Sequence, residues 1–168
     1  MNSIVLVNIL RFIVLIAAQA LLFNKFNFNG YINPHPYILF IILYPVNGNK
    51  NVLLISAFLL GLIVDMFQDT AGIHATACLV LAYLRDYIFK FSFGLSYEYQ
   101  TVKLNDSLTP ERFSFILIAV FIHHFILFLL DIFSVEYIWG TILRTLFSMI
   151  FTIILCIIII YLFKPSKR

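Results

Sequence analysis

The chain has 168 residues, of which 62% are hydrophobic and 11% are charged, and its formal net charge is +3. An ordinary globular domain is about 45–50% apolar, so this composition predicts an integral membrane protein in which residues 1–168 form one transmembrane domain. The lysines and arginines are scattered, which argues against a nucleic-acid surface, and the two cysteines, Cys78 and Cys156, lie far apart in apolar runs that suggest neither a disulfide framework nor a metal site.

The predicted fold class is an all-α polytopic bundle of about six transmembrane helices, because crossing a membrane takes about 20 apolar residues per helix. Five segments are clear spans: 4–23, 52–67, 73–93, 113–133 and 138–163. The remaining apolar segment, 37–46, spans only about 15 Å as a helix against a hydrocarbon core of about 30 Å. We expect a short or re-entrant helix there, covered by its neighbours, so five and six crossings both fit.

The loop charges predict the orientation of the second half of the chain. With six crossings and a cytoplasmic N-terminus, seven lysines and arginines lie inside and one outside, and with five crossings and an external N-terminus all eight lie inside. Both arrangements place the 90–112 loop and the C-terminus in the cytoplasm. Both also place the 67–72 turn on the outer side.

Several ionisable residues fall inside the apolar segments, where each one costs at least about 2.5 kcal/mol at the helix centre. Arg11 and Asp86 each lie about eight residues from the cytoplasmic side, so we predict that they pair. Arg144 and Asp65 both lie close to the outer surface, and we predict a second pair there. Arg85 is expected to extend toward the lipid head groups. We interpret the pairs as fixing helix register.

The sequence contains no HExxH, GxSxG or phosphate-binding glycine motif, so we predict no enzymatic activity, no metal site and no cofactor. His123 and His124 are adjacent in one helix and point about 100° apart, which prevents them from binding one metal ion from the same face. A hydrogen bond to a neighbouring carbonyl is expected instead. Asp131 lies near a helix end, where we expect it to be solvated.

Small residues and turn formers dominate the stretch DTAGIHATAC, residues 69–78. Turn formation is expected at Asp69 and Gly72, and small residues allow two membrane helices to approach closely. On the preceding helix, Ala57 and Gly61 have the small-xxx-small spacing that serves the same purpose. We interpret the region as a packing site first, with these residues as candidates: Ala57, Gly61, Asp65, Ala71, Gly72, His74 and Ala75.

The longer stretch 61–88, which includes these residues, resembles the rod shape-determining protein MreD family of bacterial inner membranes. The matching pattern is an apolar run that ends in Gly-x-x-x-Asp, followed by a turn with glycine, an apolar residue and histidine: Gly61, Asp65, Gly72, Ile73 and His74. The resemblance implies a non-enzymatic subunit of the lateral cell-wall elongation machinery, which works beside the bitopic protein MreC, the filament protein MreB, a RodA-type glycosyltransferase and a class B penicillin-binding transpeptidase. It also implies a six-helix fold shared with substrate-binding subunits of energy-coupling-factor transporters.

Two functional hypotheses follow. A scaffold would offer a groove to the transmembrane helix of a partner, with Ala57, Gly61, Ala71 and Ala75 as its small residues. The alternative is a substrate-binding membrane subunit of a small-molecule, vitamin-type transporter. That alternative predicts a solvent-open outer pocket lined by Asp65, His74 and Arg144.

Overall fold

The computed structural model describes residues 2–25, 32–94, 108–132 and 138–162, and the regular elements in these ranges are helical, as the sequence predicts. The elements are α1 (Asn2–Leu21), η1 (Phe23–Lys25), η2 (Pro36–Ile38), α2 (Leu39–Ile42), α3 (Lys50–Gln68), α4 (Ile73–Phe93), α6 (Pro110–Ile132) and α7 (Ile138–Leu162). Here η marks a short 3₁₀ helix.

Three helices are long and apolar enough to cross a membrane, namely Lys50–Gln68, Pro110–Asp131 and Ile138–Leu162. Helix α4 is also long, with 21 residues, but it carries Arg85 and Asp86 in its second half. The prediction of a membrane protein is therefore supported. Length and hydropathy in the described residues do not confirm the predicted count of about six spans.

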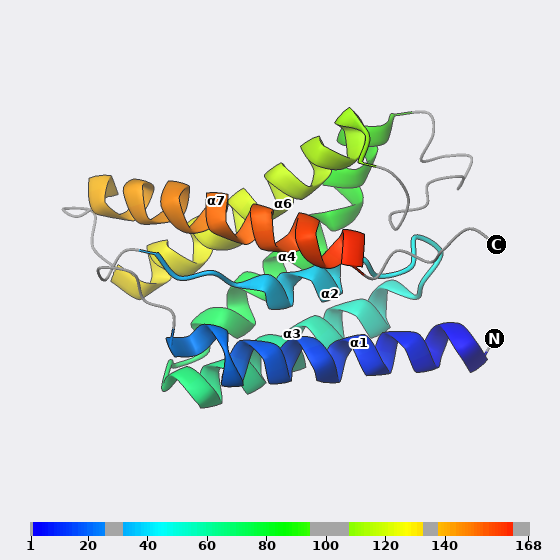
Figure 1. Cartoon of the computed structure of the whole chain (residues 1–168), viewed down its shortest axis with the longest axis horizontal. Coiled ribbons are helices and arrows are strands. Elements are labelled where there is room, and N and C mark those ends of the chain that lie inside the picture. The colour runs from blue at the N-terminus through cyan, green and yellow to red at the C-terminus, as the bar shows by residue number, and fades with distance from the viewer. Residues whose placement is uncertain (1, 26–31, 95–107, 133–137, 163–168) are drawn as a thin grey trace.

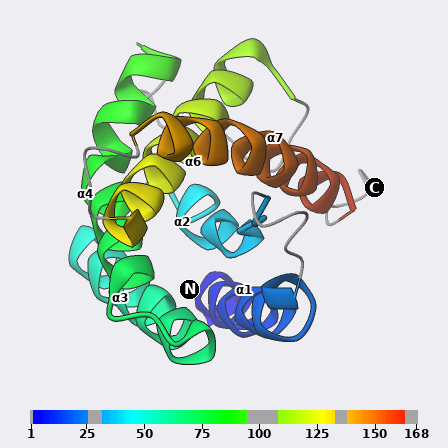
Figure 2. The same cartoon turned by 90° about the vertical axis from the view of Figure 1, so that its left-hand side faces the viewer.

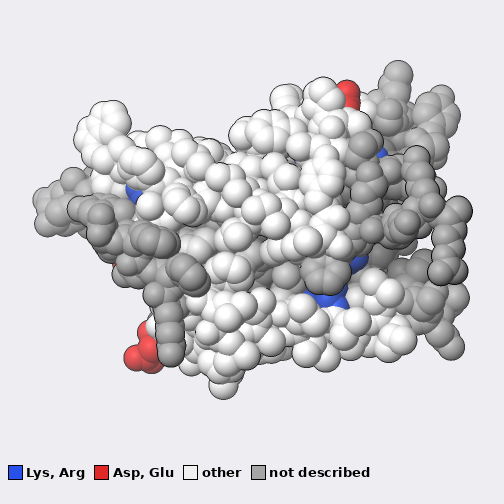
Figure 3. Space-filling model, viewed as in Figure 1, with Lys and Arg blue, Asp and Glu red and all other residues white. Residues whose placement is uncertain are grey.

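The long helices pack in chain order, since α3 contacts α4, α4 contacts α6, and α6 contacts α7, while α1 lies against α3. Viewed along the bundle, these helices surround η2 and α2, which occupy the centre (Figure 2). Helix α1 begins at the end of the bundle where α7 finishes (Figure 1). Few charged side chains of described residues reach the face seen in Figure 3, as expected of a surface in contact with lipid.

The central segment is almost completely excluded from the surface. Tyr37, Ile38, Leu39 and Ile41 are 0% exposed. The helical part of the segment begins at Pro36, whose missing N–H costs little in a first turn, and it ends after Ile42. The prediction of a short helix covered by its neighbours is confirmed for this part of the chain.

The backbone on the N-terminal side of this segment is held by hydroxyl groups of α7. The N–H of Asn33 donates to Ser148 Oγ at 3.0 Å, and the N–H of His35 donates to Thr152 Oγ1 at 3.0 Å. An extended chain inside a bundle has no helical partners for its own N–H groups, so side chains must supply the acceptors. The polar residues of α7 therefore fix the position at which the central segment enters.

Two arginines hold the other end of the segment. The guanidinium of Arg11 donates to the backbone oxygen of Leu43 at 2.9 Å, and that of Arg85 donates to the backbone oxygen of Tyr44. Carbonyl groups at the C-terminus of a helix lack helical donors and carry partial negative charge, which favours cations there. These arginines thus complete the hydrogen bonding of a short buried helix.

These contacts correct two predictions. Asp86 does not pair with Arg11 but with Lys50, the first residue of α3, with Nζ and Oδ2 3.0 Å apart. Arg85 does not extend to the lipid head groups, because its side chain is only 3% exposed and points to the end of α2. Both predictions considered charged partners and lipid only, whereas the nearest acceptors are backbone carbonyls.

Candidate functional site

The carboxylate of Asp65, in the last turn of α3, caps the start of the next helix. Its Oδ1 accepts the backbone N–H of His74 at 3.0 Å, and its Oδ2 accepts that of Ala75 at 2.9 Å. Oδ1 also accepts the hydroxyl of Thr70. Helix α4 needs this help because its own N-cap residue, Gly72, has no side chain to supply an acceptor. A buried carboxylate is tolerated here because its oxygens meet donors of the same chain.

Gly61 allows the two helices of this hairpin to touch. A Cβ atom at Gly61 would lie 2.5 Å from the backbone nitrogen and Cα of Ala75, which is too close for any other residue. Ala75 is 2% exposed, and Ala57 is fully buried. The turn itself uses left-handed backbone at Asp69 (φ 55°) and Gly72 (φ 84°).

The packing interpretation is confirmed for Gly61, Ala57 and Ala75, whereas a Cβ at Gly72 would meet nothing within 4 Å. Helix α4 already occupies the surface of Gly61, and Ala57 and Ala75 are buried inside the chain. Of the four proposed groove residues, Ala71 is the one that is exposed. A partner helix would therefore need another surface of the bundle.

All four histidines of the chain come together beside this hairpin. The ring of His35 lies 5.2 Å from that of His74 and 5.3 Å from that of His124, and His123 and His124 are 5.4 Å apart. They come from the segment before η2, from α4 and from α6. Sequence analysis missed this cluster, because nothing in the spacing of the four residues indicates that they meet.

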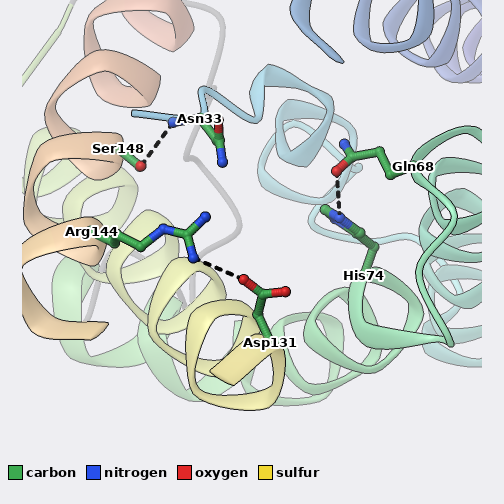
Figure 4. Close-up of polar contacts among 6 residues, drawn as sticks. All are labelled: Asn33, Gln68, His74, Asp131, Arg144 and Ser148. Carbon is green, nitrogen blue, oxygen red and sulfur yellow. Dashed lines mark hydrogen bonds and ion pairs between the residues drawn. The ribbon is translucent and has the colours of Figure 1, made fainter. Parts of the chain in front are cut away.

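Tyr37 links two of these rings. Its hydroxyl lies 2.7 Å from Nδ1 of His74 and 3.0 Å from Nε2 of His123. Nε2 of His74 lies 3.1 Å from the side-chain oxygen of Gln68, so Nε2 is the donor and Nδ1 is the acceptor (Figure 4). Tyr37 therefore donates to His74 and accepts from His123.

His124 completes a second set of bonds. Its Nδ1 donates to the backbone oxygen of Val120 at 2.9 Å, which confirms the predicted bond to a neighbouring carbonyl. Its Nε2 accepts the hydroxyl of Thr152 at 3.0 Å, and Thr152 in turn accepts the N–H of His35. Within the described residues, no group of three or more His, Cys, Asp or Glu side chains is placed to hold a metal ion. The rings of His74, His123 and His124 are thus held by hydrogen bonds within the chain.

Arg144 pairs with Asp131 rather than with Asp65, and the N–O distance is 2.9 Å. Figure 4 shows this pair across from Gln68 and His74. The prediction of an Arg144–Asp65 pair is therefore wrong, whereas Asp131 is exposed, as expected, and bonds to Arg144 as well. The pair joins α6 to α7, since Asp131 lies in the last turn of α6 and Arg144 in the second turn of α7.

A polar cavity of about 350 Å³ lies where α1 and α3 finish. The described residues that line it are Gln19, Phe23, Asn24, Asn33, His35, Phe67 and Gln68. The amide nitrogens of Gln19 and Gln68 both donate to Asn24 Oδ1, at 3.1 and 3.0 Å, and so tie the two helices together across the cavity. The residues predicted for an outer pocket, Asp65, His74 and Arg144, are not in this lining.

No protein-family model matches the chain, and no curated protein or solved structure matches it either. The resemblance to MreD thus depends on the residues of the α3–α4 hairpin. In this structure Gly61, Asp65 and Gly72 all serve to join α3 to α4.

Proposed function

We propose that the chain is a non-enzymatic scaffold subunit of the bacterial cell-wall elongation machinery, comparable to MreD proteins, in the inner membrane. One observation carries this proposal: the residues of the resemblance build the α3–α4 hairpin. Both oxygens of Asp65 accept bonds from backbone N–H groups of α4. A carboxylate engaged in this way fixes a rigid platform and is poorly placed to act on a substrate.

The polar interior supports the same proposal. Arg11 and Arg85 bond to the end of the central helix, and the histidines bond mainly to Tyr37, Thr152 and other groups of the same chain. A rigid bundle with apolar outer faces suits the docking of partner helices through packing and a few hydrogen bonds. The partners we propose are an MreC-like bitopic protein, an MreB-like filament, a RodA-type glycosyltransferase and a class B penicillin-binding transpeptidase.

The proposal includes six passes through the membrane, with both termini and the 90–112 loop in the cytoplasm. The support is the course of the central segment, which runs from the end where α1 finishes to the end where α3 begins (Figure 1). The segment covers the length of the bundle as an extended stretch followed by a short helix. Side chains of neighbouring helices supply hydrogen bonds to its backbone, which makes such a path possible inside a membrane.

Site-specific photocrosslinking in native membranes tests the scaffold. A photoreactive phenylalanine analogue is placed at one exposed position on each of four helices and at one buried aromatic control position: Leu10, Phe58, Phe121 and Ile154, with Phe115 as the control. We expect the helix or helices that face the partner to give an adduct with the MreC-like protein, while the control gives none. Adducts with lipid alone at all four exposed positions would contradict the proposal.

The alternative, a substrate-binding subunit of a vitamin-type transporter, is favoured by the polar cavity at one end of the bundle. The same crosslinking distinguishes the two functions by the proteins that are crosslinked to the chain. Recovery of an ATPase module would favour transport, and recovery of wall-synthesis proteins would favour the scaffold.

A further inference from the structure

Two deeply buried side chains in the lining of the polar cavity keep polar atoms without a hydrogen bond. Among the residues that the structure describes, neither ring nitrogen of His35 has a partner, and the same holds for the side-chain oxygen of Gln19. His35 is 2% exposed and Gln19 is 1% exposed. Unpaired buried polar groups are rare in native proteins, so each one needs an explanation.

The surroundings of His35 explain why the chain itself does not satisfy the ring. Its backbone N–H is fixed to Thr152, and Pro36 follows directly, so the ring has little freedom to move. Its close neighbour His74 uses both ring nitrogens elsewhere, on Tyr37 and Gln68, and His124 likewise bonds at both nitrogens. His35 lines the cavity, and its ring keeps one donor and one acceptor unused.

The lining also indicates which chemistry the cavity accepts. Among the residues that the structure describes, it combines amide side chains, an imidazole and the rings of Phe23 and Phe67, and none of these lining residues is Asp, Glu, Lys or Arg. An ion would lose its hydration there without meeting an opposite charge, whereas a hydroxyl group both donates and accepts. Ligand pockets have volumes of about 300–1,000 Å³, so this cavity of about 350 Å³ suits a single small molecule.

We propose that the cavity binds a neutral ligand rich in hydroxyl groups, such as a sugar ring or a polyol, with His35 and Gln19 as its main hydrogen-bonding partners. Such a group can be a free solute or the head group of a lipid, since the cavity lies where α1 and α3 finish. The inference stands apart from the scaffold role, because neither partner docking nor its crosslinking test involves this cavity.

The first test measures thermal unfolding of the full-length protein in phosphatidylcholine nanodiscs, free of glycoside detergents that carry sugars themselves. One arm adds glucose, N-acetylglucosamine or myo-inositol, with glucuronate and glucosamine as charged counterparts. The other arm adds monoglucosyl diacylglycerol to the nanodisc. We expect at least one neutral probe to raise the midpoint by about 2–4 °C at saturation, and the two arms distinguish a solute from a lipid.

The absence of a rise with any neutral probe in either arm would overturn the proposal, and so would an equal rise with the charged counterparts. Gln19→Leu and His35→Phe keep similar volumes and should each weaken the apparent affinity at least about tenfold. Asn51→Ala, exposed in the first turn of α3, is the matched control and should keep the response. An undiminished response in both cavity variants would place binding elsewhere and overturn the site.

A labelling experiment gives a readout that does not depend on variant stability. Cys78 and Cys156 are fully buried, so a cysteine introduced at Phe67, which is 61% exposed at the cavity, is the accessible thiol among the described residues. The bound probe should slow its reaction with a hydrophilic maleimide. The reaction of Phe91→Cys in the last turn of α4 should not change. Equal rates at Phe67→Cys with and without the protective probe would contradict binding in this cavity.

Discussion

Replacement of Asp65 removes several hydrogen bonds at once, because its carboxylate accepts from three donors of the α3–α4 hairpin. Loss of a helix cap costs about 0.5–2 kcal/mol, and unpaired buried N–H groups add to that cost. We expect Asp65→Ala to lower the free energy of unfolding by about 2 kcal/mol, measured by denaturant titration in nanodiscs. Asp69→Asn is the control, since Asp69 is exposed and asparagine tolerates its left-handed backbone. Equal losses in both variants would contradict the capping role.

Two glycines in helices offer a paired prediction about close packing. Gly61→Ala forces a methyl group against the backbone of Ala75, and overpacking of this kind costs about 1–3 kcal/mol of unfolding free energy. Gly140→Ala meets nothing within 4 Å, so removing a flexible glycine from α7 should change stability by between zero and about 1 kcal/mol in the favourable direction. Both are measured in the same unfolding assay, and effects of the same sign would contradict the close contact.

The charged residues show how far sequence reasoning reaches at this scale. Their depth along each helix can be read from the sequence, and depth suggested partners for Arg11 and Arg144. Depth does not give the rotation of each helix, however, and it omits backbone acceptors. Arg11 bonds to the carbonyl of Leu43, and Arg144 pairs with the nearby Asp131. The small residues Gly61 and Ala75 were easier to interpret, because close packing depends on size alone.

At the scale of elements, the sequence predicted that the central segment forms a short helix, but it did not predict that this helix lies at the centre of the bundle. Ten apolar residues with flanking prolines predict a short covered helix in 37–46. Its position at the centre follows from the packing of α3, α4, α6 and α7 around it, and hydropathy does not distinguish a residue facing lipid from one facing the core. The histidine cluster was missed for the same reason, since His35, His74 and His123 meet only after this packing is formed.

Thr152 gives the test of how the central segment is held. Thr152→Val keeps the shape of the side chain but removes the acceptor for the His35 N–H and the donor to His124. We expect a loss of about 1–3 kcal/mol in unfolding free energy, with faster hydrogen exchange in peptides covering 33–38. The control is Thr76→Val, because Thr76 is exposed and its hydroxyl donates to the backbone oxygen of Gly72, four residues earlier. Unchanged exchange in Thr152→Val would mean that packing alone holds the segment.

For the whole molecule, composition predicted a helical membrane protein, and the described residues agree. The number of crossings was harder, because hydropathy rates each segment in isolation. The central segment is too short by that criterion, and α4 carries Arg85 and Asp86 in its second half. The structure gives a physical reason why these segments suit a bundle in the membrane: the polar groups of one bond to those of the other, as Arg85 bonds to Tyr44. Such mutual satisfaction cannot be seen in either segment alone.

The sidedness of the two termini provides the last prediction. Helix α1 begins at the end of the bundle where α7 finishes, which is the arrangement that our proposal of six passes expects (Figure 1). The basic residues of the loops and the tail favour the cytoplasm for that end. We expect reporter fusions at the N-terminus and at the C-terminus both to be active only in the cytoplasm. A fusion within the 67–72 turn is the control and should report the outer side. An external N-terminus with a cytoplasmic C-terminus would instead mean five crossings, with the central segment entering and leaving on the same side.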